Sequence, residues 1–322
     1  AGGLRFDIPW YFIQNKKNLF TWDATDAVVN AINNRGAFAL ASIVTCPPWA
    51  AANSSGYQWT RPKNAADYAT FCGQVAQRYR GKIDAYEIWN EPNGALFFSP
   101  NPDPVFYTSM VRAAYPKIKA ADSSVTVLAG ALGSTGNTAS TVSGLDFLTA
   151  MYANSVGPYC DAISNHPYEW NFTSTFADGM RYDTAPIRQM IKMRELMVSK
   201  GDSAKKIWLT EFGAPTIGDV TQEKQNNLIF NCIQQWQGVS YGGPMFIHML
   251  RDIATGSTDS EDNFGVATST YTPKTALYGI EALGRNGYPK TQAFIALNNN
   301  ADPALGAPIG PAYPLSTGWA LE

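Results

Sequence analysis

The sequence contains few charged residues. Lysine, arginine, aspartate and glutamate make up 16% of its 322 residues, whereas ~25% is typical of globular domains. The formal net charge is −2, and the sequence has no basic stripe of the kind that marks a nucleic-acid-binding protein, so we exclude that class. Aromatic residues reach 13%, with nine Trp and sixteen Tyr. A surface with little charge and many Trp and Tyr side chains suits uncharged, hydroxylated ligands.

Long apolar runs are also absent. None approaches the ~18 residues that would span a bilayer, and we therefore expect no membrane insertion. We expect the four cysteines, which form no CxxC pair, to be buried small apolar side chains, with one or two disulfides as the alternative. They are Cys46, Cys72, Cys160 and Cys232. The two histidines form no HxH pair, whereas a metal hydrolase needs three or more clustered ligands. We therefore expect neither a metal nor a cofactor.

The sequence does contain a regular alternation of short β-rich runs and helical stretches. Strands are predicted at residues 4–8, 37–45, 83–89, 125–131, 160–165, 207–210 and 244–250. Helices are predicted between and after them, at about residues 23–34, 64–79, 106–119, 145–153, 185–200, 222–237 and 274–283. Units of this kind predict an α/β fold in which a parallel sheet is closed by helices.

The nearest closed architecture is a (β/α)8 TIM barrel, which we predict for residues 1–286. Seven strands are counted where such a barrel has eight. We therefore expect the first strand and its helix to be absent from this chain and to precede Ala1; the alternative is that the β-like run 293–297 fills the gap. Residues 287–322 are rich in Ala, Pro, Gly and Asn, which predicts a C-terminal extension or a linker to another module.

Two glutamates are predicted at the carboxyl ends of strands, where the active sites of such barrels lie. Glu91 follows the strand at 83–89, and Glu211 follows the strand at 207–210. An isolated glutamate at a strand end is commonly an ion-pair acceptor. Two glutamates that face each other across a barrel mouth are what glycoside hydrolysis requires, because one protonates the leaving oxygen and the other attacks the anomeric carbon.

The residues around both glutamates favour the catalytic interpretation. Trp89-Asn-Glu-Pro-Asn93 and Thr210-Glu-Phe-Gly213 match the two catalytic motifs of the clan A glycoside hydrolases, where they follow strands four and seven. With one strand missing at the front, the third and sixth predicted strands take those places. The resemblance covers about residues 3–285 and is strongest to glycoside hydrolase family 39 and its relatives. Three further segments carry it, namely Leu4-Arg-Phe-Asp-Ile-Pro-Trp10, Pro47-Pro-Trp-Ala50 and His166-Pro-Tyr168.

The resemblance implies a role for each matching residue. Glu91 would be the general acid/base and Glu211 the nucleophile. Asn90 would hydrogen-bond the 2-hydroxyl of the sugar. Arg5 and Tyr168 would flank the nucleophile and keep it ionised.

Other candidate substrate contacts lie on the same predicted rim. The resemblance implies that His166 borders the central sugar, while for His248 a structural hydrogen bond and a ligand contact stay equally open. Tryptophans in the loops after the strands are predicted sugar platforms, because a pyranose ring packs its C–H face on an indole. These are Trp10, Trp49 and Trp170, together with Trp22 and Trp59.

The sequence therefore predicts a retaining glycoside hydrolase that acts on an oligo- or polysaccharide or a glycoside. A non-catalytic carbohydrate-binding barrel and a transglycosylase that uses the same residues are the alternatives. The substrate class favours an extracellular or surface-associated location. A module of a larger protein, such as a phage virion component, would fit the truncated start, where the first strand is expected to be absent, and the Pro-rich C-terminal segment.

Overall fold

The computed structural model describes residues 2–168, 186–286, 313–315 and 318–320. These residues fall into two compact units. The first unit comprises Gly2–Pro167 and Arg188–Thr210, and the second comprises the described parts of Tyr168–Ile187 and Glu211–Glu322. The run at 293–297, which the sequence offered as a replacement for the first strand, lies outside the described residues.

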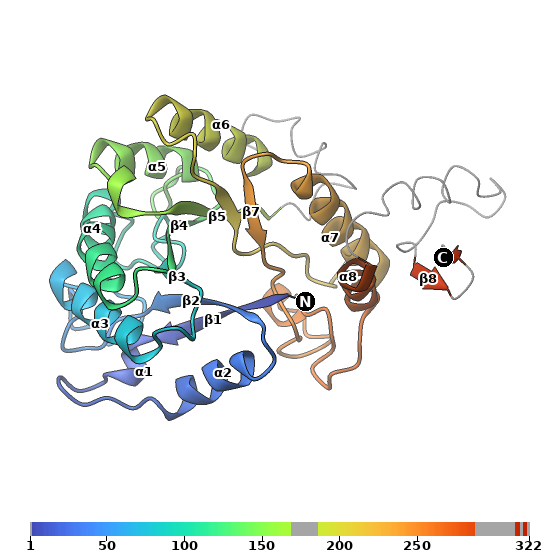
Figure 1. Ribbon diagram of the computed structural model, residues 1–322, viewed down its shortest axis with the longest axis horizontal. Helices are drawn as coiled ribbons and strands as arrows, with labels where there is room; N and C mark the ends of the chain where they lie inside the picture. Colours follow the sequence, from blue (N-terminus) through green and yellow to red (C-terminus); the bar gives the residue numbers. More distant parts are fainter. Residues whose placement is uncertain (1, 169–185, 287–312, 316–317, 321–322) are drawn as a thin grey trace. The chain divides into compact units, whose positions relative to one another are not determined.

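Parallel strands form the sheet of the first unit (Figure 1). They are β1 (Gly3–Pro9), β2 (Phe38–Val44), β3 (Ala85–Ile88), β4 (Thr126–Gly133), β5 (Ala162–His166) and β6 (Ile207–Leu209). Each strand pairs in parallel with the next one along the chain. The intervening helices are α1 (Trp10–Ile13), α2 (Asp23–Asn33), α3 (Ala65–Arg78), α4 (Pro104–Ala121), α5 (Gly144–Ala153), η1 (Gly157–Tyr159) and α6 (Pro186–Ser199). The strands and the longer helices follow the predicted order, whereas the short elements α1 and η1 were not predicted.

This sheet is strongly curled. The rings of Phe38 in β2 and Trp208 in β6 have centroids 6.0 Å apart. Those two strands are separated by β3, β4 and β5, and four strand spacings of about 4.8 Å would place them roughly 19 Å apart in a flat sheet. The contact therefore requires the sheet to bend round toward itself, as the strands of a barrel do.

Burial explains the composition of the strands. From Ala39 to Val44, β2 is buried at every position, and so is the whole of β3. A parallel sheet covered by helices buries both faces, which is why these strands are mostly apolar and show no alternation, with Glu87 of β3 as the charged exception. The four cysteines are free and buried, as expected. None of the described helices has the length and apolarity needed to cross a membrane.

A bulge interrupts β4. Gly130 and Ala131 together lie opposite the single residue Ser164 of β5, because the register shifts between Ala129 and Leu132. Such a bulge removes ladder hydrogen bonds, and two hydroxyls replace them here. The Tyr107 hydroxyl accepts from the Gly130 N–H at 2.8 Å, and the Ser164 hydroxyl accepts from the Ala131 N–H at 2.8 Å. Gly130 has φ of +121°, and a Cβ there would lie 2.6 Å from the Ser164 carbonyl oxygen, so this position requires glycine.

Two tyrosines attach helices to the ends of the preceding strands. Tyr68 of α3 donates to the Ile43 carbonyl at 2.6 Å, and Tyr107 of α4 donates to the Ile88 carbonyl at 2.7 Å. Burial raises the pKa of both hydroxyls, which therefore stay protonated and able to donate. Tyr107 thus joins the last residue of β3 to the bulge of β4.

Replacing Tyr107 with phenylalanine is expected to lower the free energy of unfolding by about 2–3 kcal/mol, because the buried Gly130 N–H and Ile88 carbonyl both lose their partner. The measurement is urea denaturation with an unchanged m-value. Tyr278→Phe, at a 60% exposed position of α8, is the control and should change nothing. A loss below about 0.5 kcal/mol for Tyr107→Phe, the range of ordinary surface substitutions, would contradict this role of the tyrosine at the bulge.

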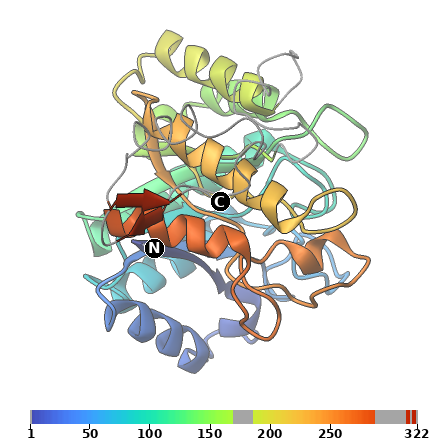
Figure 2. The same cartoon turned by 90° about the vertical axis from the view of Figure 1, so that its right-hand side faces the viewer.

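The second unit continues the alternation with α7 (Gln222–Gln237), β7 (Gly242–Met245), η3 (Ser260–Asn263) and α8 (Thr275–Asn286). The helices α7 and α8 lie side by side (Figure 2). Within the predicted extension, β8 (Tyr313–Leu315) and β9 (Gly318–Ala320) form an antiparallel pair, which the sequence did not predict. The strand predicted at 244–250 begins earlier and ends at Met245. Beyond it, the His248 and Met249 amides bond instead to the Phe212 and Phe264 carbonyls.

Candidate active site

The end of β3 places Glu91. Trp89 and Glu91 have φ of +67° and +40°, in the left-handed region that residues other than glycine rarely adopt. Backbone hydrogen bonds hold this conformation: the Trp89 N–H donates to the Ile43 carbonyl at 3.1 Å, and the Glu91 N–H donates to the Ala131 carbonyl at 3.0 Å. Strained backbone of this kind concentrates at functional sites.

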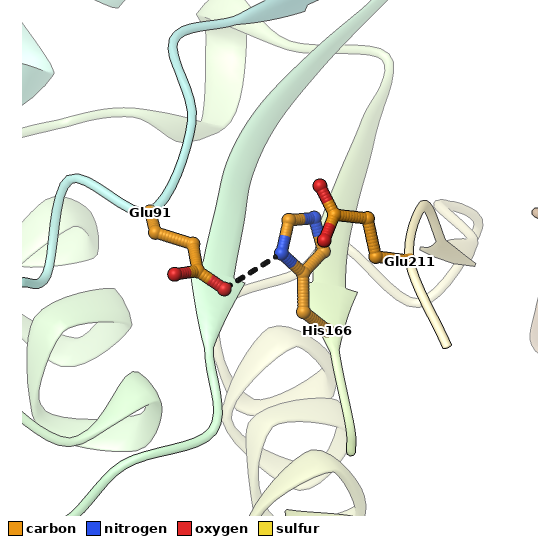
Figure 3. A group of neighbouring side chains, drawn as sticks. All are labelled: Glu91, His166 and Glu211. Carbon is orange, nitrogen blue, oxygen red and sulfur yellow. Dashed lines mark hydrogen bonds and ion pairs between the residues drawn. The ribbon is translucent and has the colours of Figure 1, made fainter. Parts of the chain in front are cut away.

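The Glu91 carboxylate hydrogen-bonds a buried histidine (Figure 3). Its Oε1 atom lies 2.9 Å from Nδ1 of His166, the last residue of β5, and His166 is fully buried. The other ring nitrogen, Nε2, lies 3.1 Å from the Thr210 hydroxyl. Thr210 immediately precedes Glu211 in the chain.

A second pair of side chains supports Asn90. Arg5 of β1 donates from Nε to Oε2 of Glu87 at 2.8 Å and from Nη2 to Oδ1 of Asn90 at 2.8 Å. Glu87 is fully buried in β3, and its other oxygen, Oε1, has no hydrogen-bond partner. The guanidinium thereby compensates a buried carboxylate. It also orients the Asn90 amide so that the oxygen faces Arg5 and the NH₂ group remains as donor.

The second unit holds Glu211. The Tyr168 hydroxyl donates to Oε2 of Glu211 at 2.7 Å, and Nδ1 of His248 lies 3.9 Å from the same oxygen. Two residues further on, a Cβ on Gly213 would lie 2.0 Å from the His248 carbonyl oxygen, so glycine is required for the two backbones to approach. The predicted contact of Tyr168 with Glu211 is therefore present, and His248 lies beside the same carboxylate.

The structure bears differently on the tryptophans that were predicted to be sugar platforms. Trp10 is fully buried: its ring packs on Trp49, Tyr68 and Phe71, and its Nε1 donates to Gln14 at 2.7 Å. Its ring cannot contact a sugar, and this expectation is wrong. Trp49 is half-buried with Nε1 donating to the Gln14 carbonyl at 2.8 Å, and it stays a candidate. Trp170 lies outside the described residues.

Sequence reasoning did not assign roles to three residues that the structure brings to this site. Glu87 offered a signal, since it is a carboxylate inside an otherwise apolar strand. Thr210 and Asn93 offered none beyond their places in the two motifs, because their partners lie on strands distant in sequence. Asn93 is almost fully buried and bonds the backbone of Gly133.

Comparison with known families identifies the family of this chain. The model of the cellulase family (glycosyl hydrolase family 5) matches residues 4–243. The chain belongs to this family of clan A glycoside hydrolases, and the predicted clan is confirmed. A comparison with curated protein sequences finds no match.

Solved structures with the same fold include members of glycoside hydrolase families 39 and 5. A family 39 glycoside hydrolase from the gut symbiont Bacteroides cellulosilyticus WH2 matches with a TM-score of 0.65 and 16% identity, over 85% of this chain and 56% of that one. A family 5 enzyme from Streptomyces cattleya in complex with Manb1-4GlcNAc gives 0.64 and 15%, over 89% and 73%. A monomeric β-xylosidase from Caulobacter crescentus CB15 gives 0.60 and 15%, over 87% and 61%.

These similarities confirm the predicted fold class, an α/β fold of the (β/α)8 TIM-barrel type. The chain spans 55–61% of the length of the first four matching structures. The expected absence of a first strand stays a prediction.

Proposed function

We propose that this chain is a retaining glycoside hydrolase in which Glu91 is the general acid/base and Glu211 the nucleophile. The observation that carries the proposal is the hydrogen-bond chain from Glu91 through His166 to Thr210. Through His166, Glu91 of the first motif is linked to Thr210, which directly precedes Glu211 of the second motif. His166 thus engages both motifs, which supports the catalytic interpretation over that of a binding barrel.

The reaction proceeds in two displacements. Protonated Glu91 donates its proton to the glycosidic oxygen while a Glu211 carboxylate oxygen attacks the anomeric carbon, so the C–O bond to the leaving group breaks and a glycosyl ester forms. Glu91, now ionised, then takes a proton from water, whose oxygen attacks the anomeric carbon and releases Glu211. Two inversions give net retention.

The observed contacts suit these roles. The hydrogen bond from Tyr168 stabilises the carboxylate form of Glu211, which is the form that attacks. The Asn90 amide, held by Arg5, presents its NH₂ group as a donor for the 2-hydroxyl of the sugar. Hydrogen bonds to that hydroxyl strengthen in the transition state of glycosidases. Whether Arg5 also flanks the nucleophile, as the resemblance implies, stays a prediction.

The substrate we propose is an oligo- or polysaccharide of neutral or weakly charged sugars. The low charge of the chain and the half-buried indole of Trp49 support this class. Such a substrate favours an extracellular or surface-associated location. Separately, the composition of residues 287–322 supports a C-terminal extension or a linker to another module.

A panel of 4-nitrophenyl β-glycosides of xylose, glucose, galactose and mannose tests this function. We expect hydrolysis of at least one member, and NMR of the first-formed product should show the β-anomer. The α-anomer would contradict the retaining mechanism. Binding of glycans without hydrolysis would favour the carbohydrate-binding barrel, and products longer than the substrate would favour the transglycosylase.

A further inference from the structure

Gly133, at the end of β4, lies directly against the Glu91 carboxylate. A Cβ at this position would lie 3.0 Å from Cδ and 3.1 Å from Oε1 of Glu91. Oε1 is the oxygen that bonds His166, and His166 is the residue of β5 that pairs with Gly133. The Glu91 oxygen therefore lies between the backbone of Gly133 and the histidine ring, and a side chain at Gly133 would press on the carboxylate.

Asn93 holds the backbone of Gly133 with two hydrogen bonds. Its Oδ1 accepts from the Gly133 N–H at 2.9 Å, and its Nδ2 donates to the Gly133 carbonyl at 2.8 Å. The same Nδ2 also donates to the Val142 carbonyl at 2.8 Å. Asn93 is two residues beyond Glu91, so one short segment carries the carboxylate and also holds the strand end against which that carboxylate packs.

The bulge of β4 completes this arrangement. It lies two residues before Gly133, and its Ala131 carbonyl accepts from the Glu91 N–H. Bulges next to active sites re-aim side chains and strand ends. Here the bulge supplies a hydrogen bond to the backbone of Glu91 and leads into the glycine that contacts its side chain.

We propose that Gly133 and Asn93 are positioning residues for the acid/base: Gly133 provides the space in which the Glu91 carboxylate meets His166, and Asn93 holds Gly133 in place. This rests on the proposed function of Glu91. The φ of Gly133 lies outside the left-handed region, so alanine strains no backbone there and acts only through its methyl group on Glu91.

The test compares Gly133→Ala with Gly136→Ala, a control in the following loop where a Cβ would meet nothing within 4 Å. The probes are 2,4-dinitrophenyl, 4-nitrophenyl and phenyl glycosides of the sugar that the wild type cleaves. A good leaving group departs without protonation, whereas phenol needs the acid. We expect Gly133→Ala to lower kcat/KM for the phenyl glycoside about tenfold, a part of the ~10²–10⁴-fold that general acid catalysis contributes, because the added methyl group would lie 3.0 Å from Cδ of Glu91 and shift its carboxylate. For the dinitrophenyl glycoside we expect a change of less than about threefold. Asn93→Ala should show the same selectivity.

Equal losses on all three glycosides would mean a merely structural role and would overturn the proposal. Crystal structures of both glycine variants provide a readout without activity. The distance from Glu91 Oε1 to His166 Nδ1, now 2.9 Å, should lengthen in Gly133→Ala and stay unchanged in Gly136→Ala. An unchanged distance in Gly133→Ala would refute the positioning role. A wild type that cleaves no glycoside would instead refute the proposed function, and the crystal structures would still decide the geometric claim.

Discussion

Replacing Glu211 with alanine is expected to lower kcat/KM by at least ~10⁴-fold on every glycoside, including those with good leaving groups. Without the nucleophile no glycosyl ester can form, so a better leaving group does not restore the rate. Added azide can occupy the vacated space and attack the anomeric carbon directly, which displaces the leaving group with a single inversion. The product should therefore be the α-glycosyl azide from a β-glycoside.

The matched control for this variant is Glu223→Ala. Glu223 lies in the first turn of α7 and is exposed, so this substitution removes a glutamate without touching the proposed site and should leave the rate unchanged. A Glu211→Ala protein that retains substantial activity, or yields an azide of retained configuration, would show that the nucleophile is another residue.

Replacing Glu91 with alanine should give the opposite pattern. On a glycoside with a poor leaving group, kcat/KM should fall about 10²–10⁴-fold, the usual contribution of general acid catalysis. On a dinitrophenyl glycoside the glycosyl-enzyme should form readily and then accumulate, because no base activates the incoming water. Azide needs no base, so it should restore turnover and give the β-glycosyl azide.

A burst of dinitrophenol followed by slow turnover, measured by stopped flow, is the signature of this variant. Added azide should also accelerate the steady-state release of dinitrophenol and give a glycosyl azide of retained configuration. If Glu91→Ala instead gave the α-glycosyl azide, or lost activity equally on good and poor leaving groups, the assignment of acid and nucleophile would be reversed or wrong.

Elements with strong local signals could be predicted from the sequence. The helix predicted at 222–237 has those bounds in the structure, because Thr221 caps its start and Gly238 follows its end. The continuous apolar run of β2 likewise marked a strand buried on both faces. The predicted end of β4 at residue 131 was two residues short, because Gly130 and Gly133 resemble the end of a strand when only their sequence is read. That Gly130 belongs to a bulge depends on hydroxyls from α4 and β5.

For the candidate site too, residues with a local sequence signal could be predicted and those placed by long-range contacts could not. Glu91, Glu211, Asn90 and Tyr168 could be singled out because short motifs surround them. Trp10 was misplaced because its position after a strand suggested the open rim, whereas one turn of helix, α1, turns its ring onto Tyr68 and Phe71 of α3. Contacts between residues distant in sequence, such as that of His166 with Thr210, carry no local signal.

The measurement that tests the central claim most directly is covalent trapping of the glycosyl-enzyme. A 2,4-dinitrophenyl 2-deoxy-2-fluoro-β-glycoside slows both displacements but leaves formation of the ester faster than its hydrolysis. After incubation and proteolysis, peptide mass spectrometry should find the sugar attached to Glu211, and the Glu211→Ala protein should take up no label. A sugar attached to Glu91 or to any other residue, or no label on a protein that still hydrolyses glycosides, would contradict the assignment of Glu211 as the nucleophile.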